Sequence, residues 1–520
     1  MYPARVLDPK SGNVFATWHL FSKREKENMM IYIAGIMVYK FGLEVFVGSF
    51  ISLATNRYDY AARIGGYART TFGRIGVLQG VNQAAQAFGA ILVAPLVKRW
   101  ETRIVLSVAM LVFALFTTLI LIVDAATGGT FKPAGASLTD FSYYGKYNTD
   151  GMIPVYAVTG IVYGMVELIR RVIPRDIVRS DVQKLRRRDA VGHLVYETTG
   201  TAGAFITALL LIPNLGNNMA IIVSPFCFAA AAMIWWFVST AEHPITLPRQ
   251  RNALSPSYLS LLAQSTQLFF ASIYNGGRIL FTSRKFIWLL PSYSLALDAH
   301  RYLENNIAPI VAQRYMGNSA WAQIMVGGSN FGELTGALFV FLFTNLVTTP
   351  MPWLRIVALG LLGHLVPRLL APLLQQRQPS LGRRRHDDAH EHERKDVGAL
   401  VTVMAFLYST YIITYSIASP ILGSYVDRVS AANNGDVHSA VFHVGGVQFT
   451  VIACMVFLTW VTPRGALAFN PQILEGEDLE RYRERDMAER PQEEVTKEGG
   501  ARTESMQGLK VGDDDWFFDL

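Results

Sequence analysis

Residues 104 to 123 read IVLSVAMLVFALFTTLILIV, a stretch of 20 residues without a charged side chain. As an α-helix this stretch is about 30 Å long, because each residue adds about 1.5 Å, and that length matches the hydrocarbon core of a bilayer. The rest of the chain is similar, since 51% of its 520 residues are hydrophobic and only 17% are charged. Ordinary soluble proteins are less apolar. The sequence therefore predicts an all-α protein embedded in a membrane.

Ten other runs are apolar over a length suited to one bilayer crossing. They lie at about 29 to 53, 77 to 96, 152 to 170, 191 to 213, 219 to 238, 286 to 309, 321 to 347, 354 to 374, 398 to 422 and 440 to 462. Six runs precede a polar stretch at 244 to 256, and five follow it. A twelfth run is missing near 375 to 396, where Arg383, Arg384 and Arg385 and a tract of His, Asp and Glu cannot enter hydrocarbon.

The runs divide the chain into five parts. We expect a cytosolic arm at 1–28, a first transmembrane half at 29–238, a cytosolic linker at 239–285, a second transmembrane half at 286–462 and an acidic, disordered tail at 463–520. Within the linker, residues 258 to 281 mix Gln and Asn with Leu and Phe. This mixture is typical of an amphipathic helix at the membrane interface.

The net charge of +7 comes from basic residues in short loops and not from one extended basic surface. We therefore expect no nucleic-acid partner. The densest basic group lies between Arg170 and Arg188, after the fourth run. The positive-inside rule places this loop and the N-terminus in the cytosol, although the arginines between 54 and 76 favour the opposite orientation.

Several classes of function lack their sequence signals. Cys227 and Cys454 both lie in apolar runs, so they predict neither a disulfide framework nor a cysteine metal site. No Gly-x4-Gly-Lys-Ser/Thr loop occurs, so no ATP is expected as a partner. No nucleophile constellation indicates an enzyme, and no cofactor is expected. The His and acidic residues at 386–393 resemble a metal tract in composition only, so we expect no metal site.

Three segments resemble the major facilitator superfamily. Ala94 to Arg103 resembles its loop motif Gly-x-Leu-x-Asp-Arg-x-Gly-Arg-Arg through Lys98, Arg99 and Arg103, with Lys98 at the acidic position and Glu101 at the second glycine. Residues 173–205 resemble its connection from helix four into helix five. Residues 305–336, with Gly328, Gly332 and Gly336, resemble helices seven and eight. In the residues of these segments and in their order, the chain resembles a fungal branch described as general-substrate transporters.

The resemblance implies two six-helix halves around a central site, with twelve spans. Only about 11 are readable, and residues 359–396 do not resemble the ninth and tenth helices. Two interpretations stay open, namely a misread exon or frameshift and a transporter that has lost a helix.

Ionisable groups near the centre of a span are costly and therefore mark functional sites. We expect Lys40, Glu44, Asp298, Arg301 and Glu333 to bind substrate or couple protons. Lys40 and Glu44 are four residues apart and can pair, so they form either a packing ion pair or a protonatable coupling site. Glu333 follows the glycine row and serves either packing or the site.

Polar side chains on two other faces complete the candidate site. We expect Gln79, Asn82, Gln83, Gln86 and Asn305 to line a cavity, although the stripe on the second run fits a polar helix contact equally well. Glu167, His193 and Glu197 lie nearer the cytosolic ends, where we expect interfacial anchors.

Together these features predict a secondary active transporter that moves a small solute by alternating access. Its partners would be the solute, protons and the lipid bilayer, in the plasma membrane or the vacuolar membrane. The alternative is a membrane sensor or scaffold that has the transporter fold but transports nothing.

Overall fold

The computed structural model describes residues 21–66, 69–137, 140–178, 182–239, 257–282, 287–342 and 393–457. Within these ranges the regular structure is helical, and the prediction of an all-α membrane protein is confirmed. The arm up to residue 20, the run at 354–374, the tract at 375–392 and the tail at 463–520 lie outside the described residues.

The first half contains a helix for each of its six predicted runs. The elements are α1 Lys23–Gly65, α2 Thr71–Arg99, α3 Thr102–Ala126, η2 Thr149–Gly151, α4 Met152–Val178, α5 Val182–Ile206, η3 Thr207–Leu211, α6 Ile212–Leu215, α7 Asn217–Ala220 and α8 Val223–Trp236. Helix α1 begins at a capping box formed by Ser22 and Glu25 and ends at Gly66, whose φ of 64° favours glycine.

A separate helix, α9 Tyr258–Thr282, precedes the second half. The elements of the second half are η4 Leu290–Leu295, α10 Ala296–Tyr302, η5 Leu303–Ile307, α11 Ala308–Arg314, η6 Ser319–Trp321, α12 Ala322–Leu342, α14 Glu393–Ala432, α15 His438–Val441, η7 Phe442–Val447 and α16 Gln448–Phe457. Elements η4 to α11 follow one another without a break and include two π-helical stretches, η4 and η5. Such stretches widen the helix locally and are frequent at functional sites.

Eight of the described helices are long and apolar enough to cross a membrane. They cover 23–65, 71–97, 102–126, 149–170, 191–215, 217–236, 402–432 and 438–456. The predicted runs at 286–309 and 321–347 are also largely helical. Several crossings of the bilayer therefore follow from the described part of the chain alone.

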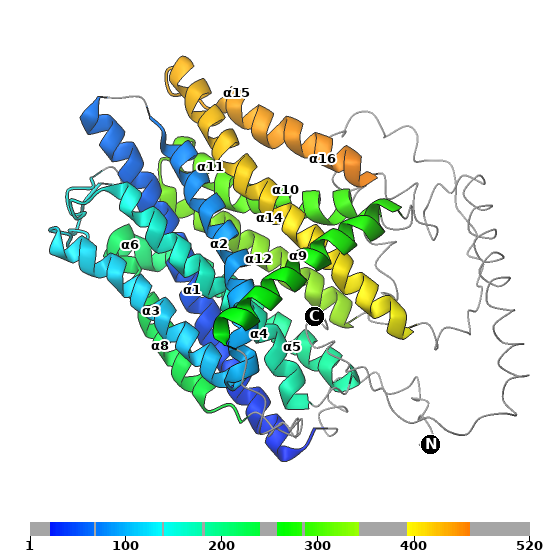
Figure 1. Cartoon of the computed structure of the whole chain (residues 1–520). Helices are drawn as coiled ribbons and strands as arrows, with labels where there is room; N and C mark the ends of the chain where they lie inside the picture. The colour runs from blue at the N-terminus through cyan, green and yellow to red at the C-terminus, as the bar shows by residue number, and fades with distance from the viewer. Residues whose placement is uncertain are drawn as a thin grey trace, which may run out of the picture.

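The largest described core lies in the first half. Phe46 and Phe50 of α1 pack with Phe113 of α3, and Phe113 stacks on Phe228 of α8 at 4.3 Å between ring centroids. Two helix pairs then join the halves, α2 with α14 and α5 with α12. Figure 1 shows α14 beside α2, so helices far apart in sequence meet along the middle of the molecule.

Helix α9 is the amphipathic segment predicted in the linker. It packs on α14 and α2 and crosses α14 in Figure 1. A Cβ atom at Gly276 would lie 2.1 Å from the carbonyl oxygen of Thr402, so glycine is required for this close approach. Phe270 and Tyr274 are exposed on α9, whereas the ring of Phe281 lies 5.9 Å from that of Phe406 on α14, between centroids. This helix is therefore attached to the bundle through a face of small residues.

Candidate functional site

Lys40 and Glu44 form an ion pair inside α1. Lys40 Nζ lies 2.6 Å from Glu44 Oε1, and the two side chains are 9% and 7% exposed. The ammonium group also lies 4.3 Å from the centroid of the Tyr196 ring on α5. A Cβ atom at Gly200 would come within 2.5 Å of Lys40 Cε. The absence of a side chain at Gly200 therefore makes room for the buried lysine.

Glu44 also contacts the second half of the molecule. Gln323 Nε2 of α12 donates to Glu44 Oε2 at 2.8 Å, and Asn330 Nδ2 donates to Glu44 Oε1 at 3.2 Å. Gly48 leaves room for Gln323, because a Cβ atom there would lie 2.6 Å from its amide carbon. Hydrogen bonds and an ion pair of this kind stabilise the ionised carboxylate. One carboxylate thus joins α1 to α12.

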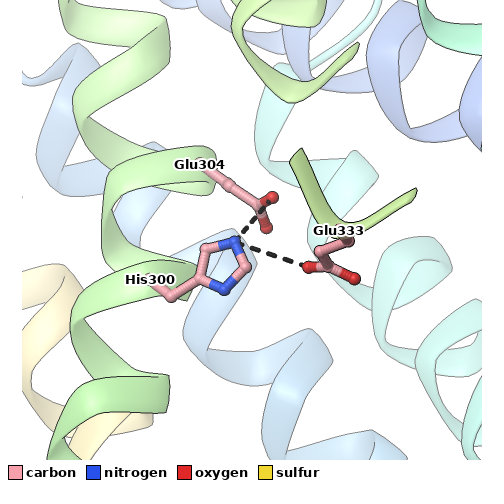
Figure 2. A group of neighbouring side chains, drawn as sticks. All are labelled: His300, Glu304 and Glu333. Carbon is pink, nitrogen blue, oxygen red and sulfur yellow. Dashed lines mark ion pairs between the residues drawn. The ribbon is translucent and has the colours of Figure 1, made fainter. Parts of the chain in front are cut away.

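A second group of ionisable side chains lies on α10, η5 and α12. Figure 2 shows His300 between Glu304 and Glu333, with His300 Nε2 at 3.0 Å from Glu304 Oε1 and 3.7 Å from Glu333 Oε1. Ser329 Oγ lies 2.9 Å from the same nitrogen. Arg301 Nη1 donates to Glu304 Oε2 at 3.0 Å. We call His300, Glu304 and Glu333 the His-Glu cluster.

Glu197 is not the interfacial anchor that its position in the sequence predicts. Its side chain is only 3% exposed, and its Oε2 atom has no hydrogen-bond partner among the described residues. It interacts electrostatically with Lys40, Glu44 and Glu333. The sequence signal was present, because Gly200 lies three residues after Glu197 on the same helix face and approaches Lys40 of α1 closely.

Asp298 is buried, at 3% exposure, and its Oδ1 atom has no hydrogen-bond partner in the described part of the chain. Neighbouring Asn306 accepts a hydrogen bond from Ser419 at 2.8 Å and donates to Tyr415 at 3.0 Å. Asn305 is half-buried. This part of η5 therefore packs against α14, whereas His300 and Glu304 face α12.

The polar stripe on α2 contacts α4 through two of its members. Asn82 Nδ2 donates to the carbonyl oxygen of Tyr156 at 2.7 Å, and Gln86 Nε2 donates to Asn82 Oδ1 at 2.8 Å. Gln79 Oε1 lies 3.5 Å from the Tyr156 hydroxyl, and Gln83 is 8% exposed. Of the two alternatives for this stripe, a cavity lining and a polar helix contact, these hydrogen bonds correspond to the helix contact.

The glycine row on α12 makes no close contact with any described helix. No described atom lies within 4 Å of a Cβ atom built at Gly328, Gly332 or Gly336. The contact with α5 is made instead by Gly327, where a Cβ atom would lie 3.2 Å from Ala204 Cβ. The Glu333 side chain is 40% exposed.

The loop-motif residues lie at the α2–α3 connection. Arg103 Nε pairs with Glu101 Oε2 at 2.6 Å, and its Nη1 lies 3.5 Å from the carbonyl oxygen of Val238. Arg99 is exposed, and Lys98 is the next-to-last residue of α2. Glu101, at the motif's glycine position, therefore supplies an acidic partner for Arg103.

A third set of contacts joins the halves near the end of α1 that lies far from Lys40. Arg314 of α11 forms two hydrogen bonds to Asp59 of α1, at 2.8 and 2.9 Å. Asp427 of α14 accepts from the backbone N–H groups of Phe72 and Gly73 at 3.1 and 2.7 Å. The orientation expected from the positive-inside rule places this end outside. We call Asp59, Arg314 and Asp427 the outer contacts.

Comparison with known proteins identifies the fold. No protein-family model and no curated protein sequence matches the chain. The crystal structure of the nucleoside transporter NupG is similar, with a TM-score of 0.53, 11% identity, and coverage of 82% of this chain and 99% of that one. The crystal structure of a D-xylose-proton symporter aligns with a TM-score of 0.47, 12% identity, and coverage of 84% and 98%.

The likeness to NupG extends over nearly all of that transporter, and its low identity makes it a likeness of fold. Two halves joined through α2–α14 and α5–α12, together with eight helices suited to span a bilayer, agree with it. The protein is thus an integral, multi-pass membrane protein with an all-α fold of the major facilitator type.

Proposed function

We propose that the protein is a secondary active transporter that moves a small solute by alternating access and is coupled to protons. The observation that carries the proposal is the position of Glu44. This buried carboxylate pairs with Lys40 within the first half and accepts hydrogen bonds from Gln323 and Asn330 of the second half. A single protonation event there changes the contact between the halves.

The coupling follows from the chemistry of the carboxylate. Ionised Glu44 is held by charge-assisted hydrogen bonds, which are stronger than neutral ones. A proton on Glu44 removes its attraction for Lys40 and weakens its bonds to α12. The Lys40 ammonium group stays charged and lies near Tyr196 and Glu197, so a neighbouring carboxylate still compensates it.

The outer contacts support movement between two arrangements. In the arrangement described here, Asp59 binds Arg314, and Asp427 caps the beginning of α2. An outward-facing arrangement requires these contacts to break, because they join the two halves at the outer end. Protonation at Glu44 and opening at Asp59 are then linked through α1, which carries both residues.

The proposal extends to the remaining expectations. The protein is not an enzyme, it resides in the plasma membrane or the vacuolar membrane, and Asp298, Arg301 and Glu333 contribute to binding or coupling. The chain resembles the fungal general-substrate branch only in the residues and the order of the segments quoted above.

The test is flux in proteoliposomes. The purified protein is reconstituted, a pH gradient is imposed, and uptake and efflux of a broad metabolite panel are measured for the parent, Glu44→Gln and Asp298→Asn. Asp140→Asn is the matched control, since Asp140 lies in the α3–α4 loop. We expect a solute whose movement follows the pH gradient in the parent and control and is lost in Glu44→Gln. If no solute moves in the parent, the sensor or scaffold alternative replaces transport.

A further inference from the structure

The His-Glu cluster has the donor geometry of a metal site. One ligand atom each from His300, Glu304 and Glu333 lies within 4.8 Å of the other two. Two ligands that each bind one ion at about 2.1 Å are at most about 4.2 Å apart, so a small movement closes the site. Glu333 is free to make this movement, because its side chain is 40% exposed.

Neighbouring side chains already orient two of the three donors. Arg301 Nη1 binds Glu304 Oε2, and this contact leaves Oε1 directed at His300. Ser329 Oγ lies 2.9 Å from the ligand nitrogen His300 Nε2, so a bound cation replaces this contact at a ring that is already directed at α12. Second-shell contacts such as that of Arg301 with Glu304 set the orientation of ligands in known metal sites.

An independent observation comes from α5. Gly327 approaches Ala204, and Asn330 approaches Gly200, so α5 and α12 run antiparallel in this register. One turn farther along, the same register brings Glu197 opposite Glu333. The Oε2 atom of Glu197 is buried and has no hydrogen-bond partner in the described ranges. A buried carboxylate oxygen without a donor is costly unless a cation compensates it.

Charge balance also favours a bound cation. The described carboxylates around this point are Glu44, Glu197, Glu304 and Glu333. Lys40 pairs with Glu44, and Arg301 pairs with Glu304. Glu197 and Glu333 then have only histidines as ion-pair partners among the described residues, His193 at 3.7 Å and His300 at 3.7 Å. Neither carboxylate therefore has a Lys or Arg side chain as an ion-pair partner in the described part of the chain.

We propose that the His-Glu cluster binds one divalent transition-metal cation of the Mn²⁺ or Zn²⁺ class. His300 Nε2 and carboxylate oxygens of Glu304 and Glu333 are the ligands, and Glu197 supplies the compensating charge beside them. An imidazole together with carboxylates selects this class over Mg²⁺ and Ca²⁺, which prefer oxygen ligands alone. Binding requires no transported solute, so it stands or falls separately from the transport function.

The experiment measures binding to the purified full-length protein in detergent. The protein carries no polyhistidine tag, and Mn²⁺, Zn²⁺ and Mg²⁺ are titrated by calorimetry and by thermal unfolding. We expect one Mn²⁺ or Zn²⁺ per chain, a raised Tm with either ion, and no effect of Mg²⁺ at the same concentration. Glu333→Gln and His300→Gln are each expected to weaken the Kd by about 10- to 100-fold or more.

Two controls separate this site from other histidines. A triple variant, His386→Gln with His390→Gln and His392→Gln, removes the tract in the sequence that resembles a metal-binding segment by composition. His443→Gln removes an exposed histidine that contacts Tyr425 on another helix pair. Both controls are expected to bind like the parent. Absence of Mn²⁺ and Zn²⁺ binding in the parent overturns the proposal, as does binding that survives in Glu333→Gln and His300→Gln.

Discussion

Among the contacts between the halves, two are of opposite kinds, α1 with α12 and α2 with α14. At the first contact a buried carboxylate, Glu44, binds amide side chains of Gln323 and Asn330. At the second, backbone lies against backbone, because a Cβ atom at Gly76 would be 2.4 Å from the carbonyl oxygen of Ser419. The first contact depends on a charge, and the second depends on shape.

On the proposed function, this difference separates two roles, the response to a proton and the close approach of the halves. A proton changes the hydrogen bonds of Glu44 but leaves the backbone contacts at Gly76 and Gly80 unchanged. A side chain added at Gly76 does the reverse, since it forces α2 away from α14 without touching Lys40. We therefore assign the response to protonation to the α1–α12 contact and the close approach of the halves to the α2–α14 contact.

The largest expected effect is on the charge-dependent contact. Glu44→Ala removes the carboxylate that lies 2.6 Å from the buried Lys40 and leaves only the weaker contacts with Tyr196 and Glu197. Breaking a buried pair destabilises a protein by about 3–5 kcal/mol. The double variant Glu44→Ala with Lys40→Met removes both charges and is expected to recover much of that loss. Thermal unfolding in detergent measures both variants. If the single variant is as stable as the parent, the pair does not hold α1 in place.

The next effect is on the shape-dependent contact. Gly76→Leu places a side chain where a Cβ atom already meets backbone, and overpacking of this kind costs about 1–3 kcal/mol. We expect loss of solute flux, because α2 and α14 cannot approach closely. Gly151→Leu is the matched control, since no described atom lies within 4 Å of a Cβ atom there. Full flux in Gly76→Leu would mean that α2–α14 contact is dispensable.

A smaller effect is expected at the outer end. Arg314 binds both oxygens of Asp59, and lysine cannot reproduce this paired geometry. Arg314→Lys should weaken the contact by about 1 kcal/mol, the net value of one hydrogen bond. Labelling of a cysteine introduced at Ser52, which contacts Ser319 across the halves, reports outer opening. We expect this cysteine to be labelled faster in Arg314→Lys than in the protein that keeps Arg314. An unchanged rate would exclude Arg314 as an outer gate.

The smallest effect concerns a residue far from both contacts. Tyr147 lies in the α3–α4 loop, and its ring stacks against the guanidinium group of Arg57 on α1. Its hydroxyl has no hydrogen-bond partner among the described residues. Burial raises the pKa of Tyr147 to about 12 against the lowering effect of Arg57, so the folded state favours the neutral hydroxyl. This stability is present below about pH 10, the value in an unfolded chain, and is lost as the pH rises to about 12.

Tyr147→Phe removes that titration. At neutral pH we expect its unfolding temperature to match the parent closely, because substitutions without lost contacts change stability by about 0.5 kcal/mol or less. Between pH 10 and 12 the parent should lose stability relative to the variant. Parallel unfolding curves across that range would show that Tyr147 is solvated.

Parts of the site followed from sequence because charge in an apolar run is conspicuous. Lys40, Glu44 and Asp298 stand out in this way, and the structure buries all three. Gln323 and Asn330 do not stand out, since amides are ordinary in a span and their partner, Glu44, lies nearly 280 positions earlier. The sequence predicts an interfacial position for Glu197, since it lies close to the basic loop that ends at Arg188. This prediction is wrong because distance along the chain says little about depth in a helix bundle. Periodicity identifies the small-residue face of Gly328, Gly332 and Gly336 but not the helix that this face meets.

The sequence alone determined that the chain crosses a membrane repeatedly as helices, because about 20 apolar residues per span are a local property set by bilayer thickness and backbone hydrogen bonding. It also determined which residues are too polar for lipid. Only the tertiary structure decided how these residues are grouped: Glu44 with α12, His300 with Glu333, and Asp59 with Arg314. These groupings depend on which helix faces which and in what register, and packing between distant segments sets both.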